Sequence, residues 1–175
     1  HKDIAKIILI GKPESIKEKA GNIDISSMTI IDPEEYEKRD EYIKQLVELR
    51  KHRGMTREKA EETLKDSVYF GCMMIKAGDA DGMVAGAVRS TPEVWRSVLQ
   101  IIKTKPGISI ASSCFLMEVP ECSYGDKGVF IYSDCGLNPD PTAEQLANIA
   151  VSAAEMGRVL ADMEPRVAML SFSTK

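Results

Sequence analysis

GDADGMVAGAVRSTP, residues 78–92, predicts a short buried strand, then a turn, then the start of a helix. Ser90 or Thr91 can cap that helix, and Pro92 suits its first turn. A strand that leads directly into a helix is the repeating unit of α/β proteins. These residues therefore favour an α/β fold, and the rest of the chain can be compared with that expectation.

Two arginines, Arg89 and Arg96, flank the start of this helix. A positive charge in a first helical turn opposes the helix dipole. A bound anion would remove the conflict, because backbone N–H groups and arginines would converge on it. The segment thus suggests a ligand that carries phosphate. The alternative for Arg96 is an ion pair with Glu93, which lies three residues earlier, and Arg89 has the same choice.

Apolar runs and helix signals alternate along the rest of the chain. They predict strands at 4–10, 28–31, 108–119, 128–133 and 167–172, and helices at 15–20, 33–51, 56–76, 92–104 and 142–160. This alternation predicts a mostly parallel sheet, in which 108–119 and 128–133 form either an antiparallel hairpin or a longer excursion. Pro106-Gly107 breaks the chain, so we expect part of one α/β domain in residues 1–106 and part of a second in 107–175.

Composition and short motifs argue against several classes of function. The net charge of −4 and the pI of about 5.3 argue against general nucleic-acid binding, and no apolar run approaches the length that spans a membrane. The four cysteines form no Cys-x-x-Cys pair, and the chain has two histidines, so we expect reduced thiols in a cytoplasmic protein and no metal site. Neither a phosphate-binding P-loop nor a Gly-x-Ser-x-Gly elbow occurs.

Several single residues are candidates for a site. Arg50 follows Ile43 and Val47 on an apolar stripe, so it points either into a cleft or simply stabilises a helix C-terminus. Asp134 follows the apolar run 129–133 and could face a cleft, although a structural role is slightly favoured, and turn formation is the commoner role for Asp79 and Asp81. The serines that could donate to phosphate are Ser112, Ser113, Ser171 and Ser173.

Five segments together resemble the phosphate acetyltransferase family. They are LRKHRGMT (49–56), DGMVAGA (81–87), LQIIKT (99–104), NPDPTAEQLA (138–147) and PRVAMLSFST (165–174). The similarity covers nearly the whole chain, in order. It implies a two-domain α/β fold like that of the isocitrate and isopropylmalate dehydrogenases, incomplete at both ends of this chain, with the active site in the cleft.

The resemblance also implies a function. The family passes an acetyl group between coenzyme A (CoA) and inorganic phosphate, as a homodimer, and we expect no metal or organic cofactor. Arg50 and Arg96 fall on the arginines that bind the CoA phosphates. Ser90 and Thr91 fall on the polar loop that lines the coenzyme site. Ser173 and Thr174 are candidates for binding phosphate or the acyl carbonyl.

The chain departs from the family pattern in two ways. Ser97 stands where the family usually has proline, directly after Arg96. Family members also begin before the point that matches His1 and continue beyond Lys175, with a Ser-Arg pair and an aspartate that orient phosphate and act in catalysis. We therefore expect the catalytic residues outside these 175 residues, and no acetyl phosphate from this chain alone. The alternatives are a phosphate butyryltransferase and a non-catalytic regulatory domain of a fused enzyme that binds CoA or acyl phosphate.

Overall fold

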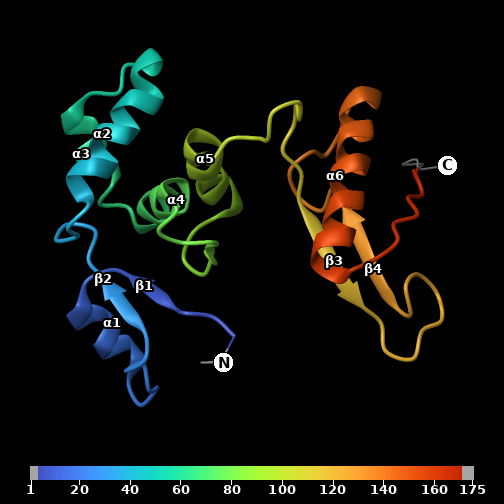
Figure 1. The fold of residues 1–175 in the computed structure, drawn as a ribbon, viewed down its shortest axis with the longest axis horizontal. Helices are drawn as coiled ribbons and strands as arrows, with labels where there is room; N and C mark the ends of the chain where they lie inside the picture. The colour runs from blue at the N-terminus through green and yellow to red at the C-terminus, as the bar shows by residue number, and fades with distance from the viewer. Residues whose placement is uncertain (1–3, 171–175) are drawn as a thin grey trace. The chain divides into compact units, whose positions relative to one another are not determined.

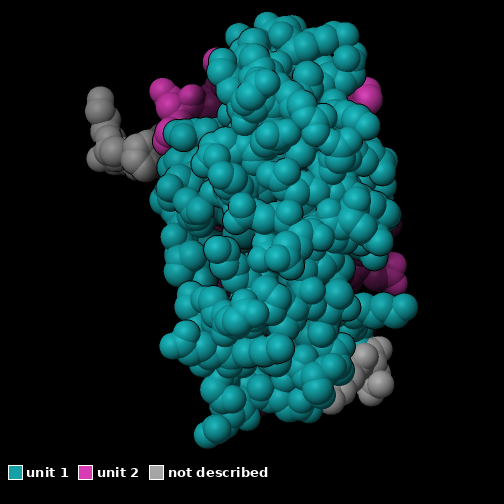
Figure 2. Space-filling view, turned by 90° about the vertical axis from the view of Figure 1, so that its left-hand side faces the viewer, with its two compact units in different colours: residues 1–103 teal, residues 104–175 magenta. Residues whose placement is uncertain are grey.

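The computed structural model describes residues 4–170, which form two compact units divided between Lys103 and Thr104. Figure 1 traces the chain, and Figure 2 colours the two units separately. The first unit carries a small parallel sheet and most of the helices, and the second carries an antiparallel hairpin with one long helix. The chain is therefore a mixed α/β protein, as the sequence predicts.

The sheet of the first unit has two parallel strands, β1 (Ile8–Ile10) and β2 (Thr29–Ile31), with Leu9 opposite Ile30. Helix α1 (Pro13–Ala20) connects them, as parallel strands require. Gly11 follows β1 and continues the ladder, because its N–H donates to the carbonyl of Ile31 at 2.9 Å. This sheet is smaller than the mostly parallel sheet that the sequence predicted.

Helices complete the first unit: α2 (Arg39–Arg50), the 3₁₀ turn η1 (Lys51–Arg53), α3 (Arg57–Thr63), α4 (Ser67–Ala77) and α5 (Thr91–Ile101). Their apolar faces meet around Tyr42, Phe70 and Met73, each fully buried. The rings of Tyr42 and Phe70 lie 5.4 Å apart, so aromatic packing ties α2 to α4. This core packs α2 and α4, the helices that carry Arg50 and Tyr69, against each other.

Two predicted helices differ from the observed ones. The helix expected at 33–51 begins only at Arg39, because Asp32 accepts from the Glu34 N–H (2.9 Å) within a local turn instead of starting the helix. The helix expected at 56–76 is two helices, α3 and α4, separated by Leu64–Asp66. The first helix ends at Thr63, and Asp66 begins the second because its carboxylate accepts from the backbone N–H groups of Val68 and Tyr69 in α4.

The strand predicted in the 78–92 segment is wrong. Residues 78–90 form no strand, and the side chains of Val84 and Val88 are exposed, with relative accessibilities of 103% and 91%. Within the described residues this segment pairs with neither β1 nor β2, which pair only with each other. The following helix does form, as α5, with Ser90 at its N-cap.

The second unit contains β3 (Cys114–Glu118), β4 (Val129–Ser133) and α6 (Ala143–Ala161). The strands pair antiparallel with Leu116 opposite Ile131, so the hairpin alternative is confirmed. The α6 helix begins where its capping box predicts, since Thr142 and Gln145 exchange hydrogen bonds of 2.8 and 3.3 Å. Residues 167–170 form no strand, and the rest of the strand expected at 167–172 lies outside the described residues.

Candidate functional site

Two adjoining cavities in the first unit form the candidate site. The larger has a volume of about 480 Å³ and is lined by Arg50, Arg53, Gly54, Met55, Lys59, Glu62, Thr63, Asp66 and Tyr69. The smaller, of about 110 Å³, is lined by Asp66, Val68, Tyr69, Arg89, Glu93 and Arg96. Asp66 and Tyr69 border both cavities, so the first turn of α4 is their shared wall.

Arg50 borders the larger cavity from the last position of α2. Its Nε is buried and has no hydrogen-bond partner, and its side chain makes no hydrogen bond or ion pair within residues 4–170. The chain turns sharply behind it through η1 and Gly54, whose φ of +72° is readily adopted by glycine. The structure therefore places an unpaired guanidinium beside the larger cavity, with Arg53 and Lys59 as further cations in its lining.

Arg96 borders the smaller cavity from α5. Like Arg50, it makes no hydrogen bond or ion pair with any described residue. The ion pair with Glu93 that the sequence offered as an alternative is not formed. Glu93 instead lies 3.9 Å from Arg89 and accepts two hydrogen bonds from Ser90.

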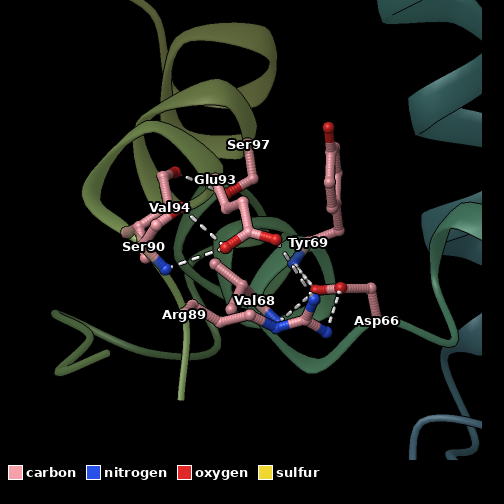
Figure 3. Close-up of polar contacts among 8 residues, drawn as sticks. All are labelled: Asp66, Val68, Tyr69, Arg89, Ser90, Glu93, Val94 and Ser97. Atoms are coloured by element: carbon pink, nitrogen blue, oxygen red, sulfur yellow. Dashed lines mark hydrogen bonds and ion pairs between the residues drawn. The ribbon is translucent and has the colours of Figure 1, made fainter. Parts of the chain in front are cut away.

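Asp66 organises the wall between the two cavities (Figure 3). Its Oδ1 accepts from the N–H groups of Val68 (2.9 Å) and Tyr69 (3.3 Å), which caps α4. Its Oδ2 lies 2.6 Å from Nη2 of Arg89, which reaches it from the opposite side. One carboxylate thus fixes both the start of a helix and an arginine that lies 23 residues further along the chain.

Ser90 and Thr91 lie at the start of α5 and are exposed, and neither lines the two cavities. The backbone N–H and the hydroxyl of Ser90 both donate to Oε2 of Glu93, at 2.8 and 2.7 Å. Ser90 thus stabilises the start of α5 through its two hydrogen bonds to Glu93. The next turn of α5 is joined to α4 by the buried Ser97, whose hydroxyl oxygen lies 3.7 Å from Sγ of Cys72 and donates to the carbonyl of Val94 within α5 at 2.7 Å.

Tyr69 and Asp66, which border both cavities, are among the lining residues that sequence reasoning missed. The Tyr69 hydroxyl lies 3.4 Å from Oε1 of Gln100 on α5. Burial raises the pKa of this hydroxyl, and the positive charges of Arg96 and Arg50 oppose the rise, so both charges act on the same ring. The usable signal was Asp66 itself, an N-capping residue type directly before the apolar run of α4.

The remaining candidates have structural partners. Asp79 pairs with Lys38 and accepts from Tyr42, and these contacts, Lys38 first, lower its pKa. Asp134 accepts hydrogen bonds from both the N–H and the hydroxyl of Ser113, from the N–H groups of Gly136 and Leu137, and from the side chain of Asn138. Each of these carboxylates therefore has a structural role, which was the slightly favoured alternative for Asp134, and Asp79 contacts α2 and the residue before it in addition to any role in a turn.

Further expectations from the sequence concerned Ser173 and Thr174, metal binding and membrane-spanning segments. Ser173 and Thr174 lie outside the described residues. Within residues 4–170, no three His, Cys, Asp or Glu side chains come together as a metal site. None of the helices in the same range combines the length and apolarity needed to cross a bilayer.

The fold and these cavities define a mixed α/β protein in which unpaired arginines border the candidate site. Comparison with known proteins narrows this class. The chain belongs to the family described as "Phosphate acetyl/butaryl transferase", whose family model matches residues 1–175.

Named relatives and solved structures agree with this assignment. The chain is 54% identical to the phosphate acetyltransferase of Thermoanaerobacterium thermosaccharolyticum, over 98% of this chain and 52% of that protein. It is 44% identical to the Escherichia coli phosphate acetyltransferase, over 99% of this chain and 24% of that protein. A phosphotransacetylase structure from Streptococcus pyogenes matches with a TM-score of 0.84 at 44% identity, over 97% of this chain and 50% of that one. The chain thus spans about half the length, or less, of these relatives.

Proposed function

We propose that this chain forms part of an enzyme that transfers an acetyl group between acetyl-CoA and inorganic phosphate. The observation that carries the proposal is the placement of Arg50 and Arg96 beside adjoining cavities, with neither arginine paired in the described chain. Arginines that lack carboxylate partners are suited to bind phosphate groups, of which CoA has three. Named relatives at 44–54% identity are phosphate acetyltransferases.

In the proposed reaction, a phosphate oxygen attacks the carbonyl carbon of acetyl-CoA. The new C–O bond replaces the C–S bond, and the thiolate of CoA leaves. Arg50 and Arg96 hold the CoA phosphates, while Ser90 and Thr91 belong to the polar loop that contacts the coenzyme. Ser173 and Thr174 contribute to binding phosphate or the acyl carbonyl. The protein then acts by orienting two anionic substrates and by neutralising charge in a ternary complex.

The proposal includes an assembly. The complete protein would have the two-domain architecture of the isocitrate and isopropylmalate dehydrogenases and would act as a homodimer in the cytoplasm. It would need no metal or organic cofactor, since both substrates bring the reacting groups. The residues that complete catalysis would lie outside this chain.

The test uses the protein expressed from its complete gene. Acetyl phosphate formed from acetyl-CoA and phosphate is measured directly, with butyryl-CoA in a parallel reaction. A kcat/KM that is higher for acetyl-CoA supports the proposal. Preference for butyryl-CoA would assign a butyryltransferase instead, and CoA binding without turnover would assign a regulatory domain.

A further inference from the structure

The smaller cavity contains as many negative as positive side chains. Arg89 and Arg96 oppose Asp66 and Glu93 in its lining. A cavity with this balance binds a phosphate well only if the carboxylates are neutralised by something other than the arginine that meets the ligand. The distribution of contacts within the cavity therefore decides which arginine is available.

Both carboxylates are held in place by backbone contacts. Asp66 uses Oδ1 to cap α4, through the N–H groups of Val68 and Tyr69. Glu93 uses Oε2 to accept from the N–H and hydroxyl of Ser90 at the start of α5. Neither side chain can turn away from the cavity without the loss of a helix cap, so their charges stay beside it.

Arg89 reaches both carboxylates through their remaining oxygens. Its Nη2 lies 2.6 Å from Oδ2 of Asp66, and its Nη1 lies 3.9 Å from Oε1 of Glu93 (Figure 3). Arg96, in contrast, pairs with neither carboxylate. One arginine thus provides the compensating charge for both fixed carboxylates, and the other is left unpaired.

We propose that Arg89 is a positioning residue that neutralises Asp66 and Glu93 and so keeps Arg96 available for a phosphate group of CoA. This inference rests on the proposed function, because it takes CoA as the ligand. Without Arg89, the two fixed carboxylates repel an incoming phosphate. They also attract Arg96, since Glu93 lies three residues before it on α5, within reach of an ion pair.

The experiment measures CoA affinity by calorimetry and acetyl transfer by kinetics, on the protein expressed from its complete gene. Arg89→Gln is expected to weaken CoA binding by about tenfold and to raise KM for CoA, with little change in kcat. Asp66→Asn and Glu93→Gln in the same chain keep the helix cap of α4 and the capping box of α5 and remove both unneutralised charges. The triple variant Arg89→Gln/Asp66→Asn/Glu93→Gln is therefore expected to recover most of the lost affinity.

Arg57 supplies a matched control. It also pairs with two carboxylates, Asp40 and, four residues later, Glu61 at 2.9 Å, and it lines neither cavity. Arg57→Gln is expected to leave CoA affinity unchanged. Thermal melts of each variant check that a loss of affinity does not reflect unfolding.

Each outcome decides a different point. Recovery in the triple variant, with weak binding in Arg89→Gln alone, supports the inference. Weak binding in both would mean that Arg89 contacts CoA directly, and this result overturns the positioning role. Unchanged affinity in Arg89→Gln also overturns it, while the proposed function stands. A wild-type protein that binds no CoA overturns the proposed function and the inference with it.

Discussion

Cys72 and Ser97 join α4 to α5 through a contact of 3.7 Å between Sγ and Oγ, and both side chains are fully buried. The Ser97 hydroxyl in turn donates to the carbonyl of Val94. Since Ser97 directly follows Arg96, this contact fixes the turn of α5 that carries the arginine. Burial also raises the pKa of the Cys72 thiol, so it stays protonated and can donate.

Ser97→Ala is expected to lower the free energy of unfolding by about 1 kcal/mol, because the Cys72 thiol loses its buried acceptor. Urea denaturation measures the change. A double-mutant cycle with Cys72→Ala isolates the contact, and strictly additive effects of the two substitutions would contradict a direct interaction.

Arg96→Ala is expected to raise KM for CoA about tenfold to a hundredfold, because a charge-assisted phosphate contact is worth about 1.5–3 kcal/mol. Steady-state kinetics on the protein expressed from its complete gene measure it. Arg57→Ala serves as the control, since Arg57 lines neither cavity. An unchanged KM in a correctly folded Arg96→Ala protein would remove Arg96 from the CoA site.

Arg50→Lys is expected to impair activity although the charge is kept. Arginine offers a planar fork that binds two phosphate oxygens, whereas lysine offers a single point of charge. The Arg50 side chain makes no hydrogen bond or ion pair with any described residue, so no carboxylate of the protein competes with a phosphate for its guanidinium. Full activity in the lysine variant would leave Arg50 with a role only at the end of α2.

The lowered pKa of the Asp134 carboxyl predicts that the stability of the fold depends on pH. Burial alone raises the pKa of this carboxyl, but the hydrogen bonds from Ser113, Gly136 and Asn138 outweigh it and lower the pKa from 3.8 to about 2. A lowered pKa means that the stabilisation is complete above pH 3.8 and is lost as the pH falls towards 2.

Asp134→Asn should therefore cost about 1–2 kcal/mol of unfolding free energy at neutral pH, and the difference from wild type should shrink below pH 3.8. Urea denaturation across this pH range measures it. Asp140→Asn, at an exposed carboxylate further along the same loop, controls for net charge. A difference that stays constant down to the lowest pH would contradict the hydrogen-bonded role.

The sequence predicted those elements whose signals are local. The α6 helix begins at its capping box because Thr142 and Gln145 satisfy each other's backbone groups without any distant residue. The strand prediction for residues 78–90 was wrong for the opposite reason. The apolar residues there suit a strand, but a strand must pair with a neighbouring strand, and the local pattern does not say whether that pairing occurs.

The candidate site was predictable in part for the same reason. Arg50 and Arg96 could be named from the family resemblance and their positions. Asp66 could not be linked to Arg89, because the contact joins residues 23 apart and depends on how α4 and α5 pack. The apolar spacing of 56–76 also suits one continuous helix, in which Asp66 would be an ordinary surface residue.

The shared wall at the first turn of α4 connects ligand binding to local unfolding. The amides of Val68 and Tyr69 are held by the Asp66 side chain, and Asp66 and Tyr69 border both cavities. When this turn frays, both cavities lose a side at once, so the frayed state and the liganded state exclude each other. A ligand that fills the cavities must therefore slow hydrogen exchange at these two amides, by a factor that reports its own affinity.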